Sequence, residues 1–457
     1  MLLAAALAVT MAGCADADTS ADSAGSGNVQ ISQNDPHPDE TSADEKNLTI
    51  SSVYAFELRE YARKYMMENP GVTIEVNSYD DVISSGGDWG MVRQEIATQM
   101  MAGSGPVLIE GQLADYLDPR TEAFFVDWLP IMAADPGFNE EDWFMNAFQA
   151  AATNGRLYAF LTKFSYKTAT TNTTVPSLFE KMSDIETVTI PELMELHREM
   201  NTEVSFFLAP SFGVGTYADY CITDFIDIET GRVDVDSDRF ITAINNASEA
   251  SIKGAGGPEV MPVTSGQERV WGDTYYFNIA DVNNMLFRYF LAHEEPLLFS
   301  GLVPIVNERE ELIIYPYESY ALNANATAGH QELAWDFIQF MMEPANQSEG
   351  GFILMQPTNR NLFRFAVERD LPNVVRTWQW QLSGSVDKAV EDTLTKMTAY
   401  GEMPMQNMRA LPHAIIGPGG IIPEAMRLFE EGLVSAEQTA RDLQNQVELV
   451  MMEMDMR

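Results

Sequence analysis

The stretch Asn154–Asn172, NGRLYAFLTKFSYKTATTN, reads as one long extended segment in the middle of the chain. Its first two residues, Asn-Gly, are a strong turn signal, because glycine takes positive φ without strain. Five of the residues that follow favour extended chain: Leu157, Tyr158, Phe160, Phe164 and Tyr166. Polar residues such as Lys163 and Ser165 interrupt any continuous buried run. The segment is therefore too polar for a buried strand, and its position in the fold has to be inferred from the rest of the sequence.

The composition indicates a folded and strongly acidic protein of one to three domains. The chain has 457 residues, of which 46% are hydrophobic, as is typical of a globular protein with a sizeable core. Its 27 basic and 68 acidic residues give a formal net charge of −41. The electrostatic field of this negative charge repels nucleic acid and anionic lipid headgroups, so we expect no nucleic-acid partner.

Residues 1–14, MLLAAALAVTMAGC, form an apolar run that is too short to span a bilayer, which takes about 20 residues. The run is typical of a signal peptide with small residues at its cleavage point. Its end, Met11-Ala12-Gly13-Cys14, resembles the lipobox of bacterial lipoproteins, in which the cysteine is lipidated and becomes the new N-terminus. No Lys or Arg precedes the run, which suggests that translation begins further upstream. We predict Cys14 as the lipidation site; the alternative is an apolar arm with an incidental cysteine.

Residues 15–46 are rich in Ser, Asp, Gly and Ala and have almost no apolar content, so this segment is predicted to be a disordered tether. A flexible chain of about 32 residues has an r.m.s. reach on the order of 30 Å, enough to hold a folded body away from a membrane. The only other cysteine is Cys221. If Cys14 carries lipid, no intramolecular disulfide is possible, and Cys221 is expected to pack as a small apolar side chain.

From Asn47 the chain alternates strand and helix signals. We predict strands at Leu48–Val53, Val72–Val76 and Val107–Ile109, separated by helices at Phe56–Met67 and Met91–Met101. This order predicts a doubly wound α/β sheet. Ligands of such sheets lie beyond the carboxyl ends of the strands, which makes three residues candidates for ligand binding: Tyr54, Tyr79 and Glu110.

Several stretches resemble the extracellular solute-binding proteins of bacterial ABC importers, the group that contains maltose-binding protein. Tyr65–Val76, YMMENPGVTIEV, resembles the family's helix end, Asn-Pro turn and second strand. The other stretches that resemble family motifs are QMMAGSGPVLI (99–109), NGRLYAFL (154–161), FIDIETGRVDVDSDRF (225–240), AWDFIQFMM (334–342) and SAEQTARDLQNQV (435–447). Two of these stretches depart from the family at one position: Val107 stands where Asp is usual, and Leu161 stands where Pro is common. The resemblance covers about residues 47–455.

The resemblance implies a two-lobed α/β fold of the periplasmic-binding-protein (Venus flytrap) type, in which crossing strands join two discontinuous lobes. Residues 47–160 and 302–343 are then expected in the first lobe, and residues 161–301 and 344–457 in the second. The segment from Asn154 would leave the first lobe and cross to the second. A crossing strand borders the ligand cleft, which gives its half-polar pattern a physical reason.

Signals for metal or catalytic chemistry are weak. The acidic run Asp234–Asp238 starts like a calcium loop but lacks the required Gly and Glu, so an acidic turn that caps a helix is expected. Three methionines in Met403–Met408 could suit Cu(I), but gap-filling core is the more ordinary role. The five histidines are scattered, and no P-loop, GxGxxG or GxSxG spacing occurs. We predict no cofactor, no metal and no enzymatic activity.

The aromatic residues are the remaining candidates for ligand contacts, because sugar rings stack on Trp or Tyr and their hydroxyls need polar partners. Packing in the core is the ordinary alternative for each of them. Trp271, in the polar setting ERVWGDTYY, is the strongest candidate, together with Tyr158 and Phe164 on the presumed crossing. Tyr317 in the returning segment and Phe212 before a predicted helix are weaker candidates.

The sequence therefore predicts a monomeric, lipid-anchored binding protein on the extracellular face of the cell membrane. The resemblance implies that it captures a solute, most often a carbohydrate or oligosaccharide in this family, and delivers it to the transmembrane subunits of an ABC permease. Two alternatives stay open: a surface glycan-degrading enzyme, and a sensor subunit that presents its ligand to a receptor kinase. The sequence names neither the sugar, nor its affinity, nor the permease.

Overall fold

A computed structural model gives the structure of the protein. It describes residues 46–53, 55–80, 82, 89–114, 122–172, 181, 185–199, 205–207, 214–227, 230–250, 275–281, 299–347, 355–377, 386–408, 411–417 and 419–455. Among these residues, no helix combines the length and the apolar character that a membrane span requires.

The N-terminal part of the fold is a parallel sheet with the predicted alternation. Strand β1 (Asn47–Ser52) lies between β2 (Thr73–Ser78) and β3 (Leu108–Glu110) and is parallel to both. Helix α1 (Ala55–Glu68) connects β1 to β2, and α3 (Trp89–Met101) precedes β3. The predicted strands and helices are confirmed here, with bounds that differ by one or two residues.

Helix α1 forms because its apolar residues recur at helical spacing. Leu58, Tyr61, Ala62 and Tyr65 are all buried, and they lie on one face of the helix. The helix ends before Asn69-Pro70-Gly71, where Gly71 has φ of 98°, a conformation that favours glycine.

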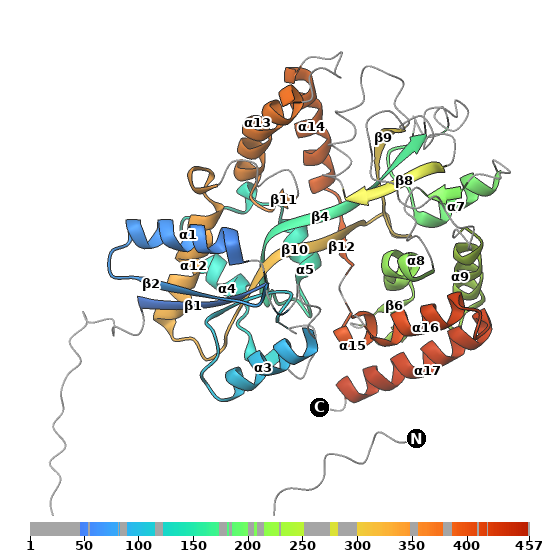
Figure 1. Ribbon diagram of the computed structural model, residues 1–457, viewed down its shortest axis with the longest axis horizontal. Coiled ribbons are helices and arrows are strands. Elements are labelled where there is room, and N and C mark those ends of the chain that lie inside the picture. Colours follow the sequence, from blue (N-terminus) through green and yellow to red (C-terminus); the bar gives the residue numbers. More distant parts are fainter. Residues whose placement is uncertain are drawn as a thin grey trace, which may run out of the picture. The chain divides into compact units, whose positions relative to one another are not determined.

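Two long antiparallel strands extend this sheet: β10 (Leu312–Leu322) and β4 (Ala159–Asn172). The strand order is β2-β1-β3-β10-β4-β8-β5, with β8 at Tyr275–Asp281 and β5 at Ser205–Phe207 (Figure 1). Strands β9 (Phe299–Pro304) and β11 (Gln356–Pro357) also pair with β4, and β12 (Met405–Asn407) pairs with β10. A separate two-stranded sheet joins β6 (Ile226–Asp227) to β7 (Arg232–Val233).

The buried apolar residues form two large cores and a smaller cluster. The first core contains Leu48, Ile50, Phe160 and Phe337 among its residues, on the face of the sheet that carries α1 and α12 (Ala328–Met342). The smaller cluster covers the other face, where Ile109 of β3 meets residues of α3. Short helices and turns complete this part of the chain: η2 (Glu122–Phe124), α4 (Trp128–Ala134), η3 (Glu140–Asp142), α5 (Met145–Ala151) and η5 (Pro344–Asn346).

The second core contains Leu193, Phe240, Ile415 and Leu443 among its residues, and it is built mainly from helices. These are α7 (Ile190–Glu199), α8 (Val214–Cys221), η4 (Ile222–Asp224), α9 (Asp238–Ala250), α15 (His413–Ile416), α16 (Ile421–Glu430) and α17 (Ala436–Asp455). Cys221 is buried in this core, as the sequence predicts. Helix α17 includes most of the predicted closing helix.

Strand β4 runs from the first core to the second. Phe160, Phe164 and Tyr166 belong to the first core, whereas Ala169 belongs to the second. The first half of β4 pairs with β10 and β11, and its second half pairs with β8 and β9 (Figure 1). The segment Asn154–Asn172 therefore contains a strand that passes from one core to the other. Most of the strand is buried, so the expectation that the segment is too polar for a buried strand was wrong, because its polar residues lie between two apolar cores.

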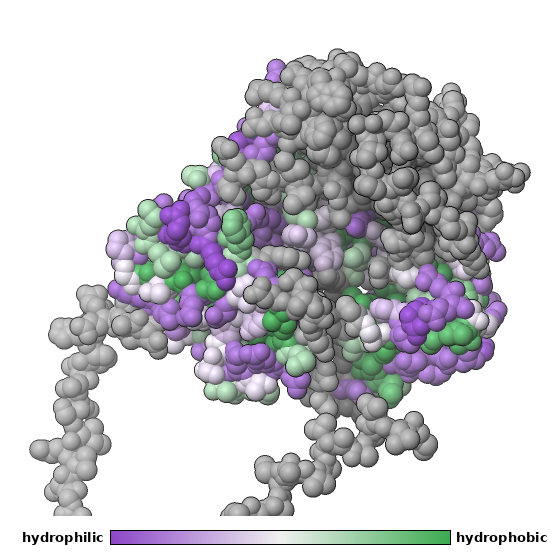
Figure 2. Space-filling view, in the orientation of Figure 1, coloured by the Kyte–Doolittle hydropathy of each residue, from purple (hydrophilic) through white to green (hydrophobic). Residues whose placement is uncertain are grey.

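The C-terminal third of the chain also contributes to both cores. Leu362 and Phe363 of α13 (Arg360–Thr377) and Met397 of α14 (Val386–Gly401) pack in the first core, whereas residues from Leu411 to Met451 pack in the second. The assignment of residues 344–457 to the second lobe, made from the resemblance, stays a prediction. Hydrophilic side chains cover much of the visible described surface, with apolar ones between them (Figure 2).

Candidate functional site

The carboxyl ends of the parallel strands come together around Glu110, the last residue of β3. Its Oε2 accepts hydrogen bonds from the Ser52 hydroxyl, at 2.6 Å, and from the Val53 backbone N–H, at 2.7 Å. The Glu110 side chain is only 3% exposed. Glu110 is therefore held by the end of β1, and its position at the carboxyl ends of the strands is the predicted one.

Backbone hydrogen bonds hold the strand ends around Glu110 close together. The Gly111 N–H donates to the Ser319 carbonyl at 2.7 Å, and a Cβ added at Gly111 would clash with the Ser319 hydroxyl. Glycine is required here because β10 approaches the end of β3 so closely. Tyr79 follows the end of β2, and its N–H donates to the Ser52 carbonyl at 2.9 Å. Burial raises the pKa of Tyr79, so this half-buried phenol stays protonated.

A partly buried ion pair lies on the two strands beside Glu110. Lys163 of β4 is opposite Glu318 of β10, and its Nζ lies 2.6 Å from Glu318 Oε2 and 3.7 Å from Glu57 Oε2 of α1. The Lys163 side chain is 12% exposed. Burial lowers the pKa of Lys163, but the carboxylate of Glu318, with smaller contributions from Tyr61 and Glu57, raises it by more. The ammonium therefore stays charged.

Tyr320 links this ion pair to Glu110. Its hydroxyl donates to Glu318 Oε1 at 3.1 Å, and its backbone pairs with Glu110 in the β3–β10 register. The register of β10 against β4 shifts on both sides of Glu318, which marks a β-bulge. Bulges re-aim side chains, and they are frequent beside binding and active sites. We call Glu57, Glu110, Lys163, Glu318 and Tyr320 the strand-end cluster.

Besides Tyr79, three of the predicted aromatic residues are described, and two of these three are buried. Tyr158 is 3% exposed in the smaller apolar cluster, and its hydroxyl accepts a hydrogen bond from Arg156 at 3.2 Å. Phe164 is fully buried, with its ring 6.2 Å from that of Phe144 in a T-shaped contact. Tyr317 is half-buried next to Tyr315, with the ring centroids 6.4 Å apart. For all three, contact with a solute stays a prediction.

Four predicted residues lie outside the described part of the chain: Cys14, Tyr54, Phe212 and Trp271. Their roles in lipidation and in ligand binding stay predictions. The strand-end cluster also contains four residues that were not predicted as site residues from the sequence: Glu57, Lys163, Glu318 and Tyr320. One signal was visible for Lys163, because it is a charged residue within an extended run that is rich in aromatic residues. Glu57 and Glu318 give no comparable signal, since the chain has 68 acidic residues and nothing in their local sequence distinguishes these two.

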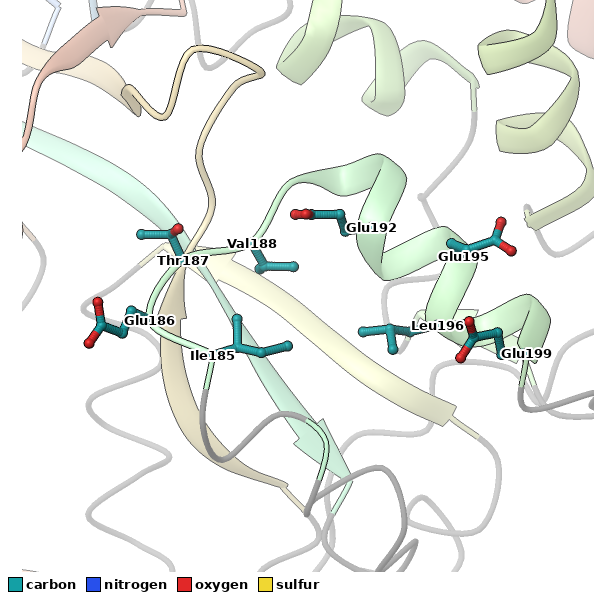
Figure 3. Close-up of a pocket in the computed structure, with 8 residues that line it drawn as sticks. All are labelled: Ile185, Glu186, Thr187, Val188, Glu192, Glu195, Leu196 and Glu199. Atoms are coloured by element: carbon teal, nitrogen blue, oxygen red, sulfur yellow. The ribbon is translucent and has the colours of Figure 1, made fainter.

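A cavity of about 500 Å³ lies elsewhere, between α7 and the segment 185–188 before it. Ile185, Val188 and Leu196 line it together with the carboxylates of Glu186, Glu192, Glu195 and Glu199 (Figure 3). Two of these carboxylates already have structural partners. Glu192 accepts from the Thr189 N–H at 2.8 Å, and Glu199 pairs with Lys181 at 2.7 Å. No aromatic residue is among the eight that line the cavity, so it lacks a stacking surface for a sugar ring.

The acidic turn before α9 and the methionine-rich segment 403–408 have structural roles in the described part of the chain. Within the described ranges, no group of three or more His, Cys, Asp or Glu side chains is placed to hold a metal ion. The acidic turn before α9 caps that helix as predicted, and the capping atom is the Ser237 hydroxyl, which accepts from the Phe240 N–H at 3.3 Å. Met405 packs in the first core and Met408 against the second.

The fold is that of the periplasmic-binding-protein structures of the maltose-binding-protein type. A putative oligosaccharide-binding protein from Synechococcus sp. MITs9220 superimposes with a TM-score of 0.58 at 10% identity, over 89% of this chain and 99% of that one. The cyclic α-maltosyl-1,6-maltose-binding protein from Arthrobacter globiformis superimposes with a TM-score of 0.54 at 12% identity, over 89% and 98%.

An oligogalacturonide-binding protein from Yersinia enterocolitica is similar as well, with a TM-score of 0.53 at 14% identity, over 89% of this chain and 99% of that one. No protein-family profile and no curated sequence matches the chain. At these identities the likeness establishes the fold, and the predicted fold class is confirmed. The chain thus has the maltose-binding-protein-like fold over about 89% of its length.

Proposed function

We propose that this protein is an extracellular solute-binding lipoprotein that captures a carbohydrate and delivers it to an ABC permease. The observation that carries the proposal is the strand-end cluster, which places charged and hydroxyl groups at the carboxyl ends of β1 and β3. This is where open α/β sheets bind their ligands. The three similar structures described above are named for oligosaccharide or oligogalacturonide binding, which supports the same class of solute here.

The path of β4 supports a binding mechanism based on closure. Because this strand carries Lys163 in its first half and contributes Ala169 to the second core, it links the cluster to both parts of the fold. Two lobes joined by crossing strands open and close, and a solute that contacts both lobes favours the closed state. The shift toward closure is no larger than the difference in the solute's affinity for the two states.

The anchor and the lobe boundaries belong to the same proposal. A lipid on Cys14 followed by the polar segment 15–46 would hold the binding body at the extracellular face of the membrane, within reach of a permease. Residues 47–160 and 302–343 would form the first lobe, and residues 161–301 and 344–457 would form the second.

The test is a thermal-shift screen of the purified chain against oligosaccharides, peptides and polyamines. A ligand at about 100 times its Kd adds roughly 2.7 kcal/mol to the free energy of unfolding, so a binding sugar raises the melting temperature clearly. Calorimetry on each hit then gives the affinity, and analysis of the recovered sugar shows whether it is chemically unchanged. Stabilisation by peptides or polyamines alone, or conversion of the sugar, would contradict the proposal.

A further inference from the structure

The strand-end cluster has an unequal charge balance, with three carboxylates, Glu57, Glu110 and Glu318, and one ammonium, Lys163. We infer that the site selects neutral or cationic sugars and rejects anionic ones, and that Glu57 is the carboxylate that meets the solute. This inference rests on the proposed function, because it assigns the charge class of the solute at the same site.

The single ammonium of the cluster is already used within the protein. Lys163 lies 2.6 Å from one carboxylate and 3.7 Å from a second, and its side chain is 12% exposed. An ammonium in this position neutralises the protein's own carboxylates and has little surface left for an acidic ligand. An anionic sugar would have to displace Glu318 from Lys163 before it gained an ion pair.

Two of the three carboxylates are occupied as well. Glu110 is 3% exposed and accepts from Ser52 and Val53. Glu318 uses one oxygen for Lys163 and the other for the Tyr320 hydroxyl. Their negative charges still act on a ligand, although their oxygens are directed to protein donors.

Glu57 differs from the other two carboxylates in both exposure and contact. Its side chain is 49% exposed, in the first turn of α1 directly after the end of β1. Its separation of 3.7 Å from Lys163 is longer than a hydrogen bond, so both oxygens keep acceptor capacity. Sugar hydroxyls and ammonium groups are donors that match it, whereas a uronate carboxylate repels it.

The fold itself leaves the charge class open, since the similar structures include one named for cyclic α-maltosyl-1,6-maltose and one named for oligogalacturonide. The side chains of each site therefore decide the choice. An anionic group about 6 Å from one unbalanced carboxylate, at an effective dielectric constant between about 20 and 40, binds on the order of 10- to 100-fold more weakly.

The experiment measures binding of size-matched trisaccharides to the full chain by titration calorimetry. Neutral probes are maltotriose, cellotriose, xylotriose and mannotriose; the anionic probe is trigalacturonate and the cationic probe is the trimer of glucosamine. We expect at least one neutral or cationic trisaccharide to bind at least tenfold more tightly than trigalacturonate. The inference is overturned, with the proposed function intact, if trigalacturonate binds as tightly as the best of the others.

A matched pair of variants tests the role of Glu57. Glu57→Gln removes the charge and is expected to weaken binding of the best neutral or cationic probe roughly 3- to 10-fold, because a charge-assisted hydrogen bond is lost. The variant should also reduce the difference in affinity between that probe and trigalacturonate. Glu68→Gln makes the same chemical change at the exposed far end of α1, 11 residues away and about 16 Å along the axis, and should change neither affinity.

Three further outcomes are decisive. If Glu57→Gln and Glu68→Gln have equal affinities and equal melting temperatures, Glu57 does not meet the solute. If Glu57→Gln alone melts at a lower temperature and binds with unchanged affinity, its role is structural and the assignment is overturned. If none of the six trisaccharides binds and the wider screen also finds no sugar, the proposed function fails first.

Discussion

Replacing Lys163 with Met tests whether the partly buried ion pair with Glu318 stabilises the site as its geometry indicates. The change removes the ammonium while keeping a side chain of similar length, and it leaves the partly buried Glu318 with the Tyr320 hydroxyl as its remaining donor. Removing one partner of a buried pair typically costs about 3–5 kcal/mol. Because Glu318 is 21% exposed and keeps one donor, we expect a smaller loss of about 2–3 kcal/mol in the free energy of unfolding.

The assay is urea denaturation of Lys163→Met, Glu318→Gln and the double variant, from which a double-mutant cycle gives the coupling energy. The control is Lys181→Met, because Lys181 pairs with Glu199 at 2.7 Å, but both side chains are about half exposed. Exposed pairs contribute about 0–1 kcal/mol, so this variant should lose far less stability. Equal losses in Lys163→Met and Lys181→Met would refute the reasoning that burial makes the first pair important.

Three other predictions concern pH, recognition and anchoring. Burial first, and then the charge of Glu308, raises the pKa of Asp224 from 3.8 to about 6. The folded state therefore binds the Asp224 proton more tightly than the unfolded state does. Protonated Asp224 contributes fully to the free energy of unfolding below about pH 4. This contribution, at most about 3 kcal/mol, is lost as the pH rises through 6. Asp224→Asn should remove that loss. The check is the free energy of unfolding from urea denaturation at pH 4 and at pH 7; a difference between the two pH values as large as that of the wild-type protein would contradict the prediction. Trp271→Ala should weaken sugar binding roughly a hundredfold, about 2.7 kcal/mol, with the melting temperature retained; calorimetry and a melt on this variant separate that result from a core role, which would lower the melting temperature and spare affinity. Cys14→Ala should release the protein from membranes, and unchanged membrane fractionation would show that no lipid on this residue anchors it.

Local sequence signals predicted the elements of the first sheet well. The run from Asn47 to Ile109 alternates apolar strands with helices that end at Asn-Pro-Gly and Gly-Ser-Gly, and each element is present in the structure. Here neighbouring segments pack on one another, so composition and spacing carry most of the information. The long strand β4 was predicted for the same reason, because its turn signal and its aromatic residues are local.

The contacts of the strand-end cluster depend on pairings that no local pattern contains. Lys163 and Glu318 are 155 positions apart, and they meet only because β4 and β10 are antiparallel in one register. The bulge near Glu318 adds a shift that periodicity does not show. For the same reason the packing of α13 and α14 in the first core was not foreseen, since an amphipathic helix does not specify which of two apolar cores it covers.

The course of β4 also limits how its length can change. Its first half is in register with β10 and β11, where Phe164 is opposite both Pro316 and Gln356, and its second half is in register with β8, where Ala169 is opposite Ile279. Side chains alternate between faces along a strand, so one inserted residue between these halves would turn every later side chain to the wrong face. Insertions and deletions that surface loops accept readily are therefore excluded from this strand, because two independent sets of partners fix its residue count.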